Sequence, residues 1–270
     1  MEVLKSLLLG IVQGVTEWLP ISSTAHLLLL DEVLHIGLSA AAKELFLILI
    51  QLASILAVVV HFFATLNPFT TKKSSAERQS TWLLLAKIIV ATIPAAVVGL
   101  FADAYLESHL QKWSVIAFTL AFYGGLYVIL EKSQIGKRER RVIALKDITW
   151  ADTIALGLFQ VLALIPGTSR SGSTILGAII LGFERGIAAQ FSFFMAIPVM
   201  AGASLLKVLK LGFAFSGAEL LIIGTGSVVA FIVSLVVIRA MLAYLKRHDF
   251  SLFGYYRIAL AIFIVFTLVL

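Results

Sequence analysis

Long apolar segments, separated by short polar ones, run through the whole sequence. Six of these segments are long enough to cross a bilayer, because a spanning helix needs about 20 consecutive apolar residues. The expected spanning helices cover residues 43–64, 82–101, 114–131, 187–208, 218–243 and 252–270. The alternation of short strands that is typical of membrane β-barrels is absent from the sequence. The pattern therefore predicts an all-α polytopic membrane protein.

Two further apolar segments are each interrupted by proline. Pro20 separates helices expected at residues 2–18 and 22–35, and Pro166-Gly167 separates helices expected at 150–165 and 169–182. At 1.5 Å per residue these helices are about 21 to 25 Å long, which is short for a hydrocarbon core of about 30 Å. Irregular backbone at this depth is tolerated only where protein or a wet cavity surrounds it. The pattern predicts two re-entrant helical hairpins.

The two halves of the chain correspond to each other. Gly10-Ile-Val-Gln13 before Pro20-Ile-Ser-Ser23 matches Gly157-Leu-Phe-Gln160 before Pro166-Gly-Thr-Ser169, with one gap. Each half holds one hairpin and three spans, and an odd number of spans gives the halves opposite orientations, which makes an inverted repeat. We expect one membrane domain over 1–270, with repeat 1 at about 1–131, a cytoplasmic linker at 132–147 and repeat 2 at about 148–270. The hairpin tips can then meet near the middle of the membrane.

Positive charge is concentrated beside the spans on one side. In this arrangement the expected loops at 65–81, 132–147 and 244–251, with flanking residues such as Lys87 and Arg257, hold most of the 21 Lys and Arg residues. An excess of Lys and Arg marks the cytoplasmic side. Both termini and the entrance of the first hairpin are therefore expected outside. The net charge of +6 is thus explained by membrane orientation, and we expect no nucleic acid partner.

Composition supports the membrane class and removes several chemistries. The 270 residues are 60% hydrophobic and 13% charged, whereas about a quarter of a typical soluble domain is charged. The absence of cysteine excludes disulfides, thiolate nucleophiles and thiolate metal sites. No Gly-x-x-x-x-Gly-Lys nucleotide motif is present. The N-terminal apolar segment lacks a signal-peptide cleavage pattern, so we expect it to be retained.

The most polar stretch within an apolar region is Pro166-Gly-Thr-Ser-Arg-Ser-Gly-Ser-Thr174. A charged side chain at membrane depth is costly and usually functional, and Arg170 presents a planar fork of donors that suits phosphate. A helix that begins near Ser169 would add free N–H groups and the positive end of its dipole. Two alternatives stay open, namely that Arg170 is an ion-pair partner and that the small residues pack helices together. The phosphate-binding residues expected here are Ser169, Arg170, Ser171 and Thr174.

Residues 13–26 supply the groups that the second hairpin lacks. Gln13 and Glu17 share a helix face at i, i+4, and the Glu17 carboxylate could bind a divalent cation or act as an acid or base. Ser23 and His26 are three residues apart, and a base beside a hydroxyl is the minimum for an activated nucleophile. The alternative is a capping serine and a packed histidine. The further substrate-binding residues expected on this side are Ser22 and Thr24, in the first turn of the helix, and Gln51, which matches a polar zone of the second half.

In these motifs the chain resembles the undecaprenyl-diphosphatase family, the bacterial bacitracin-resistance phosphatases. The resemblance runs essentially from end to end and rests on Gln13-Gly-Val-Thr-Glu17, Ser22-Ser-Thr-Ala-His26 and Pro166–Thr174, in that order. It implies hydrolysis of undecaprenyl diphosphate to undecaprenyl phosphate and inorganic phosphate, which recycles the lipid carrier for peptidoglycan synthesis and cell wall biogenesis. It also implies a bacterial cytoplasmic (inner) membrane protein whose active site opens to the outer face.

The resemblance also implies a divalent cation, Mg²⁺ or Ca²⁺. Some members carry Glu at the position of Gln13, so Glu17 is the better metal ligand and Gln13 assists it. We expect the catalytic residues to be Glu17, Ser23, His26 and Arg170, acting on a polyprenyl diphosphate. The nucleophile, Ser23 or a water activated by His26, stays open, as does the oligomeric state, a homodimer among the options. The competing hypothesis is a secondary transporter or flippase of an anionic, phosphate-headed substrate, because transporters often contain inverted repeats with broken helices.

Overall fold

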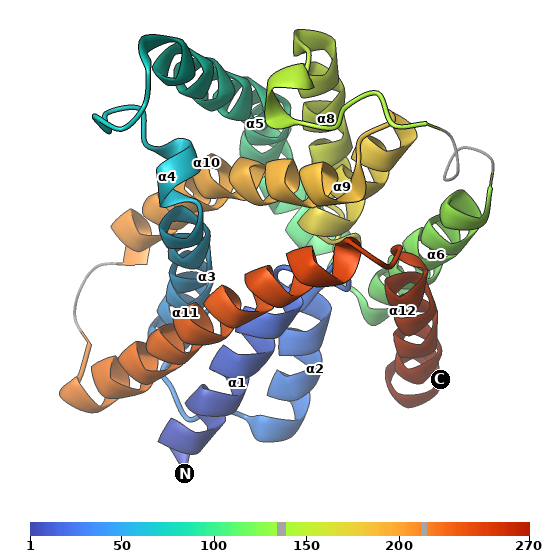
Figure 1. The fold of residues 1–270 in the computed structure, drawn as a ribbon. Coiled ribbons are helices and arrows are strands. Elements are labelled where there is room, and N and C mark those ends of the chain that lie inside the picture. Colours follow the sequence, from blue (N-terminus) through green and yellow to red (C-terminus); the bar gives the residue numbers. More distant parts are fainter. Residues whose placement is uncertain (134–138, 212–214) are drawn as a thin grey trace.

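The computed structural model describes residues 1–133, 139–211 and 215–270, and within them the fold is helical without any β-strand (Figure 1). Residues 134–138 of the expected linker, with Lys137 and Arg138, lie outside the described residues. In chain order the helices are α1 (Glu2–Thr16), α2 (Ser23–Leu34), α3 (Ala40–His61), α4 (Phe63–Leu66), α5 (Ser75–Leu110), α6 (Trp113–Lys132), the 3-10 turn η1 (Leu145–Asp147), α8 (Trp150–Leu162), α9 (Arg170–Ile180), α10 (Arg185–Leu211), α11 (Gly217–Leu245), α12 (Ser251–Ile264) and the π-turn η2 (Val265–Val269).

Six helices in the described ranges are long and apolar enough to cross a membrane. They are α3, α5, α6, α10, α11 and α12 with η2. The prediction of an all-α protein with six spanning helices is confirmed. The four remaining helices of the expected hairpins, α1, α2, α8 and α9, are short, with 15, 12, 13 and 11 residues. Their lengths are consistent with re-entrant hairpins.

The prediction of a loop at 65–81 is wrong over most of that range. α4 covers its start, and α5 already begins at Ser75. A capping box explains this start, because Ser74 Oγ accepts the N–H of Glu77 at 3.3 Å and the Glu77 carboxylate accepts the N–H of Ser74 at 2.7 Å. The charges that suggested a loop therefore surround a helix start. α5 also continues to Leu110, past the expected end at residue 101.

The two pairs of short helices enter the bundle from opposite ends, and their tips meet inside it (Figure 1). α1 and α2 extend toward the end that carries both termini, whereas α8 starts at the opposite end. The tips touch where Ser171 Oγ lies 3.3 Å from the carbonyl oxygen of Leu19. This is the arrangement that an inverted pair of hairpins requires, while the proposed boundaries of the two repeats stay a prediction.

Matched glycines bring each hairpin close to a spanning helix. A Cβ placed on Gly10 of α1 would lie 2.5 Å from the carbonyl oxygen of Gly226 in α11, and one on Gly157 of α8 would lie 2.8 Å from that of Ala91 in α5. Backbone carbonyls of a helix cannot move aside easily. A side chain at either glycine would therefore push the helices apart. Each hairpin is thus seated on a spanning helix from the other half of the chain.

Arg257 of α12 is a buried cation between the two tips, and its expected role as a loop-flanking charge is wrong. Its side chain has no exposure. The guanidinium donates to the carbonyl oxygen of Pro20 at 3.1 Å and to those of Gly167 and Thr168, each at 3.0 Å. Carbonyls in a broken helix lack an intrahelical donor and need another partner when buried. Arg257 supplies that partner to both hairpins at once.

Candidate active site

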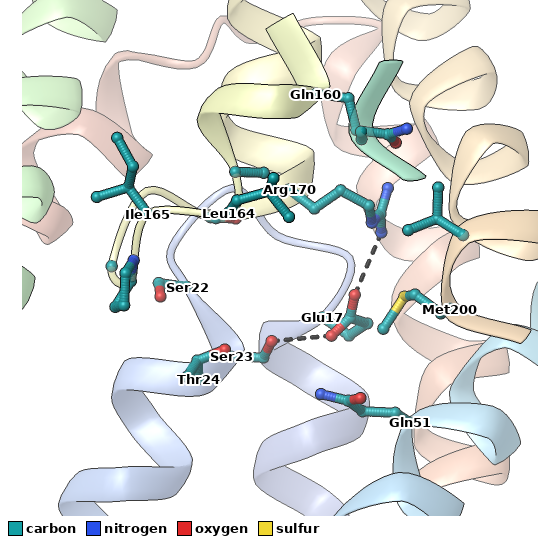
Figure 2. A pocket seen from close by; sticks show the side chains of 16 residues that line it. Glu17, Ser22, Ser23, Thr24, Gln51, Gln160, Leu164, Ile165, Arg170 and Met200 are labelled. Atoms are coloured by element: carbon teal, nitrogen blue, oxygen red, sulfur yellow. Dashed lines mark hydrogen bonds and ion pairs between the residues drawn. The ribbon is translucent and has the colours of Figure 1, made fainter. Parts of the chain in front are cut away.

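A cavity of about 180 Å³ lies between the hairpin tips (Figure 2). Its polar wall comes from both tips, and α3, α5 and α10 complete it with residues that include Ala95, Val199 and Met200. The structure places most of the expected site residues on its wall. The expected residues that line it are Glu17, Ser22, Ser23, Thr24, Gln51, Ser169 and Arg170.

Each tip ends in a serine that has a positive φ and caps the following helix. Ser22 has φ 74° and accepts the N–H of Ala25 at 3.4 Å, and Ser169 has φ 71° and accepts the N–H of Gly172 at 3.1 Å. A positive φ is costly for residues other than glycine and is retained mainly at functional sites. Because both serines line the cavity, α2 and α9 both begin at it, and helix N-termini favour anions.

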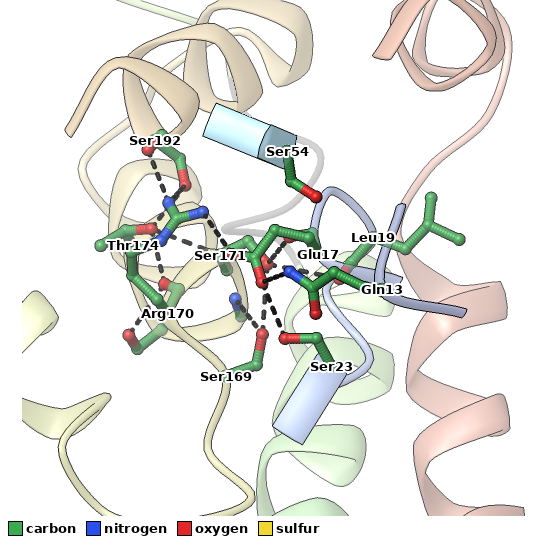
Figure 3. A network of polar contacts seen from close by, with 12 residues as sticks. Gln13, Glu17, Leu19, Ser23, Ser54, Ser169, Arg170, Ser171, Thr174 and Ser192 are labelled. Atoms are coloured by element: carbon green, nitrogen blue, oxygen red, sulfur yellow. Dashed lines mark hydrogen bonds and ion pairs between the residues drawn. The ribbon is translucent and has the colours of Figure 1, made fainter. Parts of the chain in front are cut away.

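Glu17 is the centre of a buried polar network (Figure 3). Its Oε1 accepts a hydrogen bond from Arg170 Nη2 at 3.2 Å, and its Oε2 accepts from Ser23 Oγ at 2.8 Å and from Gln13 Nε2 at 3.2 Å. The side chains of Glu17 and Arg170 are 5% and 11% exposed. Removing one partner of a buried ion pair leaves the other charge uncompensated. The network joins the two polar stretches of the sequence in one site.

Arg170 is held from behind by α10. Its Nη1 donates to the carbonyl oxygen of Ser192 at 2.7 Å. Thr174 Oγ1 lies 2.8 Å from the carbonyl oxygen of Arg170 and 2.7 Å from Ser192 Oγ. Ser192 was not proposed as a site residue from the sequence. Ser192 orients the guanidinium of Arg170 through contacts that no local sequence motif predicts.

Ser171 and Thr174 do not line the cavity, although both were expected to bind substrate. Each is 1% exposed. Ser171 Oγ is directed to the carbonyl oxygen of Leu19, and Thr174 contacts Arg170 and Ser192. The reason is their place on α9, since both side chains face packed neighbours. Their contacts hold the tips together and support Arg170.

The expected contact between Ser23 and His26 is not made. His26 Nδ1 lies 2.7 Å from the carbonyl oxygen of Ser22, so this nitrogen carries the proton, and Nε2 lies 2.6 Å from the hydroxyl of Tyr256 in α12. The two rings stack with centroids 5.6 Å apart. His26 turns toward α12 and does not line the cavity, while Ser23 turns toward Glu17. In this geometry the base beside Ser23 is therefore a carboxylate.

Gln160 lines the cavity and was not proposed as a site residue. It is 1% exposed, and its Oε1 accepts no hydrogen bond from the described residues, which is also true of Gln13 Oε1. Its Nε2 donates to the carbonyl oxygen of Ala91 at 3.4 Å. A sequence signal for this residue existed, because the repeat motif matches Gln13 with Gln160. A buried amide oxygen without a donor suits a cation, a water or a substrate hydroxyl.

The oxygen ligands at Glu17 and Gln13 suit a hard divalent cation, although they are few. Carboxylate and amide oxygens are ligands that Mg²⁺ and Ca²⁺ prefer, and Gln13 Oε1 and the Glu17 carboxylate provide both kinds. Within the described residues no group of three or more His, Cys, Asp and Glu side chains could hold a metal. The protein thus offers few ligands. Mg²⁺ commonly takes its remaining ligands from water and substrate phosphates.

Comparisons with known proteins find relatives along nearly the whole chain. Residues 6–263 match the family described as Bacitracin resistance protein BacA. An undecaprenyl-diphosphatase of Enterococcus faecalis is 48% identical over 268 residues, which cover 97% of this chain and 95% of that protein. Undecaprenyl-diphosphatase 1 of Clostridioides difficile is 48% identical, with 98% and 96% covered. An undecaprenyl-diphosphatase of Lachnoclostridium phytofermentans is 50% identical, with 96% and 94% covered.

Proposed function

The chain belongs to the family of bacitracin resistance protein BacA, and from this premise we propose that it hydrolyses undecaprenyl diphosphate to undecaprenyl phosphate and inorganic phosphate in the cavity between the hairpin tips. One observation carries the proposal: Arg170 and Ser23 both contact the carboxylate of Glu17. Relatives that cover nearly the whole chain are named for this phosphatase activity. The product is a lipid carrier for cell wall synthesis. Nothing in the comparisons favours the transporter or flippase hypothesis.

The diphosphate is the part of the substrate that this cavity can bind. Arg170 offers a guanidinium whose Nε has no partner among the described residues, and phosphate suits its fork of donors. Ser22, Thr24 and Ser169 add hydroxyls and the first-turn N–H groups of two helices. Gln51 closes the α3 side of the cavity. These groups would position the terminal phosphorus beside Ser23.

The chemical step uses the 2.8 Å contact between Ser23 and Glu17. Glu17 takes the hydroxyl proton while Ser23 Oγ forms a bond to the terminal phosphorus, and the bond from that phosphorus to the bridging oxygen breaks. Undecaprenyl phosphate leaves, and Arg170 stabilises the charge on the transferred group. Water then hydrolyses the phosphoserine, which releases phosphate and restores Ser23. A water that attacks directly would use the same carboxylate as its base.

His26 is proposed to act through position. Its bonds to the carbonyl oxygen of Ser22 and to Tyr256 fix the first turn of α2 against α12. The first turn of α2 carries Ser23, so a displaced His26 would move the nucleophile. In this role His26 affects the reaction through the position of Ser23 and does not contact the reacting atoms.

A divalent cation, Mg²⁺ or Ca²⁺, is proposed at Gln13 Oε1 and Glu17. When bound together with substrate phosphate oxygens, it would neutralise part of the charge that builds up on them. Ser169 and Arg170 face the same diphosphate from the other tip.

The chain is a multi-pass membrane protein, and its proposed place is the bacterial cytoplasmic membrane. The end that carries residues 67–74 and 139–149 is proposed to face the cytoplasm, because Lys and Arg are concentrated there. Both termini and the opening of the cavity would then face outward. The lipid substrate would keep its isoprenoid chain in the bilayer and insert only its head group.

Phosphate release from a long-chain polyprenyl diphosphate tests the proposal. Purified wild type, Arg170→Ala and the control Arg239→Ala, which changes an exposed arginine of α11, would be assayed with and without Mg²⁺. We expect release by wild type and by the control, dependent on the cation, and none by Arg170→Ala. Normal release by folded Arg170→Ala would contradict the proposed site. Full activity in excess chelator would contradict the cation.

A further inference from the structure

A second, separate cavity lies toward the end of the molecule that carries residues 67–74 and 139–149. Its volume is about 260 Å³, and it shares no lining residue with the active-site cavity. Its walls come from α4, the segment before α5, the first four turns of α5 and η1. At about 30 Å³ per water molecule in the liquid, it has room for a group much larger than water.

Lys87 of α5 is the residue that points to a ligand for this cavity. It is 5% exposed, and its ammonium donates one hydrogen bond, to the carbonyl oxygen of Ile148 at 2.5 Å. An ammonium carries three N–H donors. In the described ranges Lys87 forms no ion pair with a carboxylate. A buried cation with spare donors is costly by itself and favours a bound anion.

The other charges on the wall add to this field. Lys146 is exposed, and Lys73 uses its ammonium on three oxygen atoms at 2.9 to 3.0 Å, so it contributes charge but no free donor. Glu77 is the acidic residue of the lining, and its carboxylate is engaged by the N–H and Oγ of Ser74 at the helix cap. Among the lining residues, three lysines against one glutamate leave two positive charges. The Asp152 carboxylate also acts on Lys87, but it is paired with Arg141. The cavity therefore suits an anion such as a phosphate.

The position of the cavity indicates where that phosphate comes from. Trp82 directly follows a lining residue of α5 and is 52% exposed, and Trp150 at the start of α8 is 45% exposed. The Trp150 ring lies 5.9 Å from the Lys87 ammonium. Exposed tryptophans near the ends of apolar helices are typical of the level of the lipid head groups. The cavity thus opens where phospholipid phosphates lie.

We propose that this cavity binds the phosphate of an anionic phospholipid head group. Lys87 would donate its two spare N–H groups to the phosphate from inside, and Lys146 would close over it from the outer edge. The hydroxyls of Ser80 and Thr81 are on the same wall. Lysines beside a membrane surface are attracted to anionic lipids. The site is independent of the proposed hydrolysis and would anchor this end of the protein in the bilayer.

Native mass spectrometry of the purified full chain, titrated with phosphatidylglycerol or phosphatidylcholine, tests the proposal. The variants are Lys87→Gln, which can still donate to Ile148, Lys146→Gln on the surface, and the two combined. Lys72→Gln is the matched control, because this exposed lysine of the same end does not line the cavity. Arg170→Ala shows whether the lipid has entered the active site instead.

We expect the combined variant to bind phosphatidylglycerol about tenfold more weakly than wild type, with Lys72→Gln and Arg170→Ala close to wild type and phosphatidylcholine weak throughout. Unchanged binding by the combined variant would overturn the proposal, and so would an equal loss in Lys72→Gln. Displacement of phosphatidylglycerol by millimolar inorganic phosphate would show that the cavity takes free phosphate, which overturns the lipid as its occupant. If Lys87→Gln fails to fold, Lys146→Gln alone decides, with a several-fold loss expected.

Discussion

Arg170 Nη2 lies 3.2 Å from Glu17 Oε1, although 153 positions separate the two residues in the chain. This contact joins two hairpins that come from opposite ends of the bundle, and it is buried on both sides. The active site therefore exists only when both hairpins are in place. We propose two functions for the pair that can be measured separately: it stabilises the joined tips, and it supplies the carboxylate and the guanidinium for phosphoryl transfer.

A double-mutant cycle separates these functions. Glu17→Gln and Arg170→Gln should each destabilise the protein by about 3 kcal/mol, because each leaves a buried charge without its partner. The double variant should recover much of this loss, since no charge is left unpaired. Its hydrolytic activity should stay absent. Melting temperature and phosphate release on the same samples provide both readings. Additive losses of stability would contradict a direct pairing of the two side chains.

Ser23→Ala distinguishes the two nucleophiles. If Ser23 attacks, the variant should lose at least about 10³-fold in kcat, as expected for removal of a covalent nucleophile. If water attacks directly, the loss should be about tenfold, which corresponds to about 1.4 kcal/mol of barrier. Rapid acid quench of wild type with a labelled terminal phosphate should trap phosphoserine only in the first case. Thr24→Ala, at the neighbouring exposed position of α2, shows the effect of losing a hydroxyl that only binds substrate.

Arg257→Lys tests whether one cation holds both tips. A lysine ammonium cannot span the carbonyl oxygens of Pro20, Gly167 and Thr168 with the geometry of a guanidinium. We expect a loss of about 10²-fold in kcat with a smaller change in KM, because misplaced tips affect the reacting geometry most. Arg185→Lys, which changes the ion pair of Arg185 with the buried Glu131 outside the site, is the control. Equal effects of the two substitutions on kcat would indicate that Arg257 contributes only to general stability, which would contradict its proposed role at the tips.

The spanning helices and the meeting of the two polar stretches could be predicted because each depends on local patterns. Apolar runs of spanning length mark the six helices, and Pro20 and Pro166 mark the breaks. The meeting of the hairpin tips was expected from the inverted repeat, whereas an ion pair of Arg170 was only one of the alternatives left open. The Ser74–Glu77 capping box also indicated the start of α5, but the charged residues around it led to the prediction of a loop.

The partners of Arg257 and His26 could not be predicted, because they depend on how helices pack. In the sequence Arg257 lies shortly after a loop, as do the charged residues that set membrane orientation. Its contacts with the hairpin tips arise only from the packing of α12 in the bundle. The Tyr256 hydroxyl meets His26 across 230 positions. The spacing of three residues predicted a contact between His26 and Ser23. In the structure the two side chains point in different directions from α2, so this contact is not made. Contacts between distant helices leave no local signature in one sequence.

Gln160→Leu tests a residue of the cavity wall that was not predicted from the sequence. The substitution keeps the volume of the side chain approximately and removes its amide oxygen, which accepts no hydrogen bond from the described residues. If that oxygen holds a water or a substrate group, activity should fall about 10- to 100-fold. Gln160→Glu, which keeps an acceptor, should retain more activity than Gln160→Leu. Thr153→Val, a buried polar change on the same helix, should leave kcat within about twofold of wild type and thus controls for packing in α8.

Tyr256→Phe decides between a positioning and a catalytic histidine. Its hydroxyl is 2.6 Å from His26 Nε2, so its removal frees that nitrogen without a large loss of packing. If His26 positions α2, the variant should lose a few-fold in kcat, and the pH dependence should keep its shape. If His26 were the base, exposing its ring nitrogen should shift the acidic limb of the kcat profile, because that limb would report the titration of the imidazole. His26→Gln sharpens the comparison, since an amide can keep a contact to the carbonyl oxygen of Ser22 but cannot act as a base. Substantial activity in His26→Gln, with an unshifted profile in Tyr256→Phe, is the result expected when Glu17 is the base for Ser23.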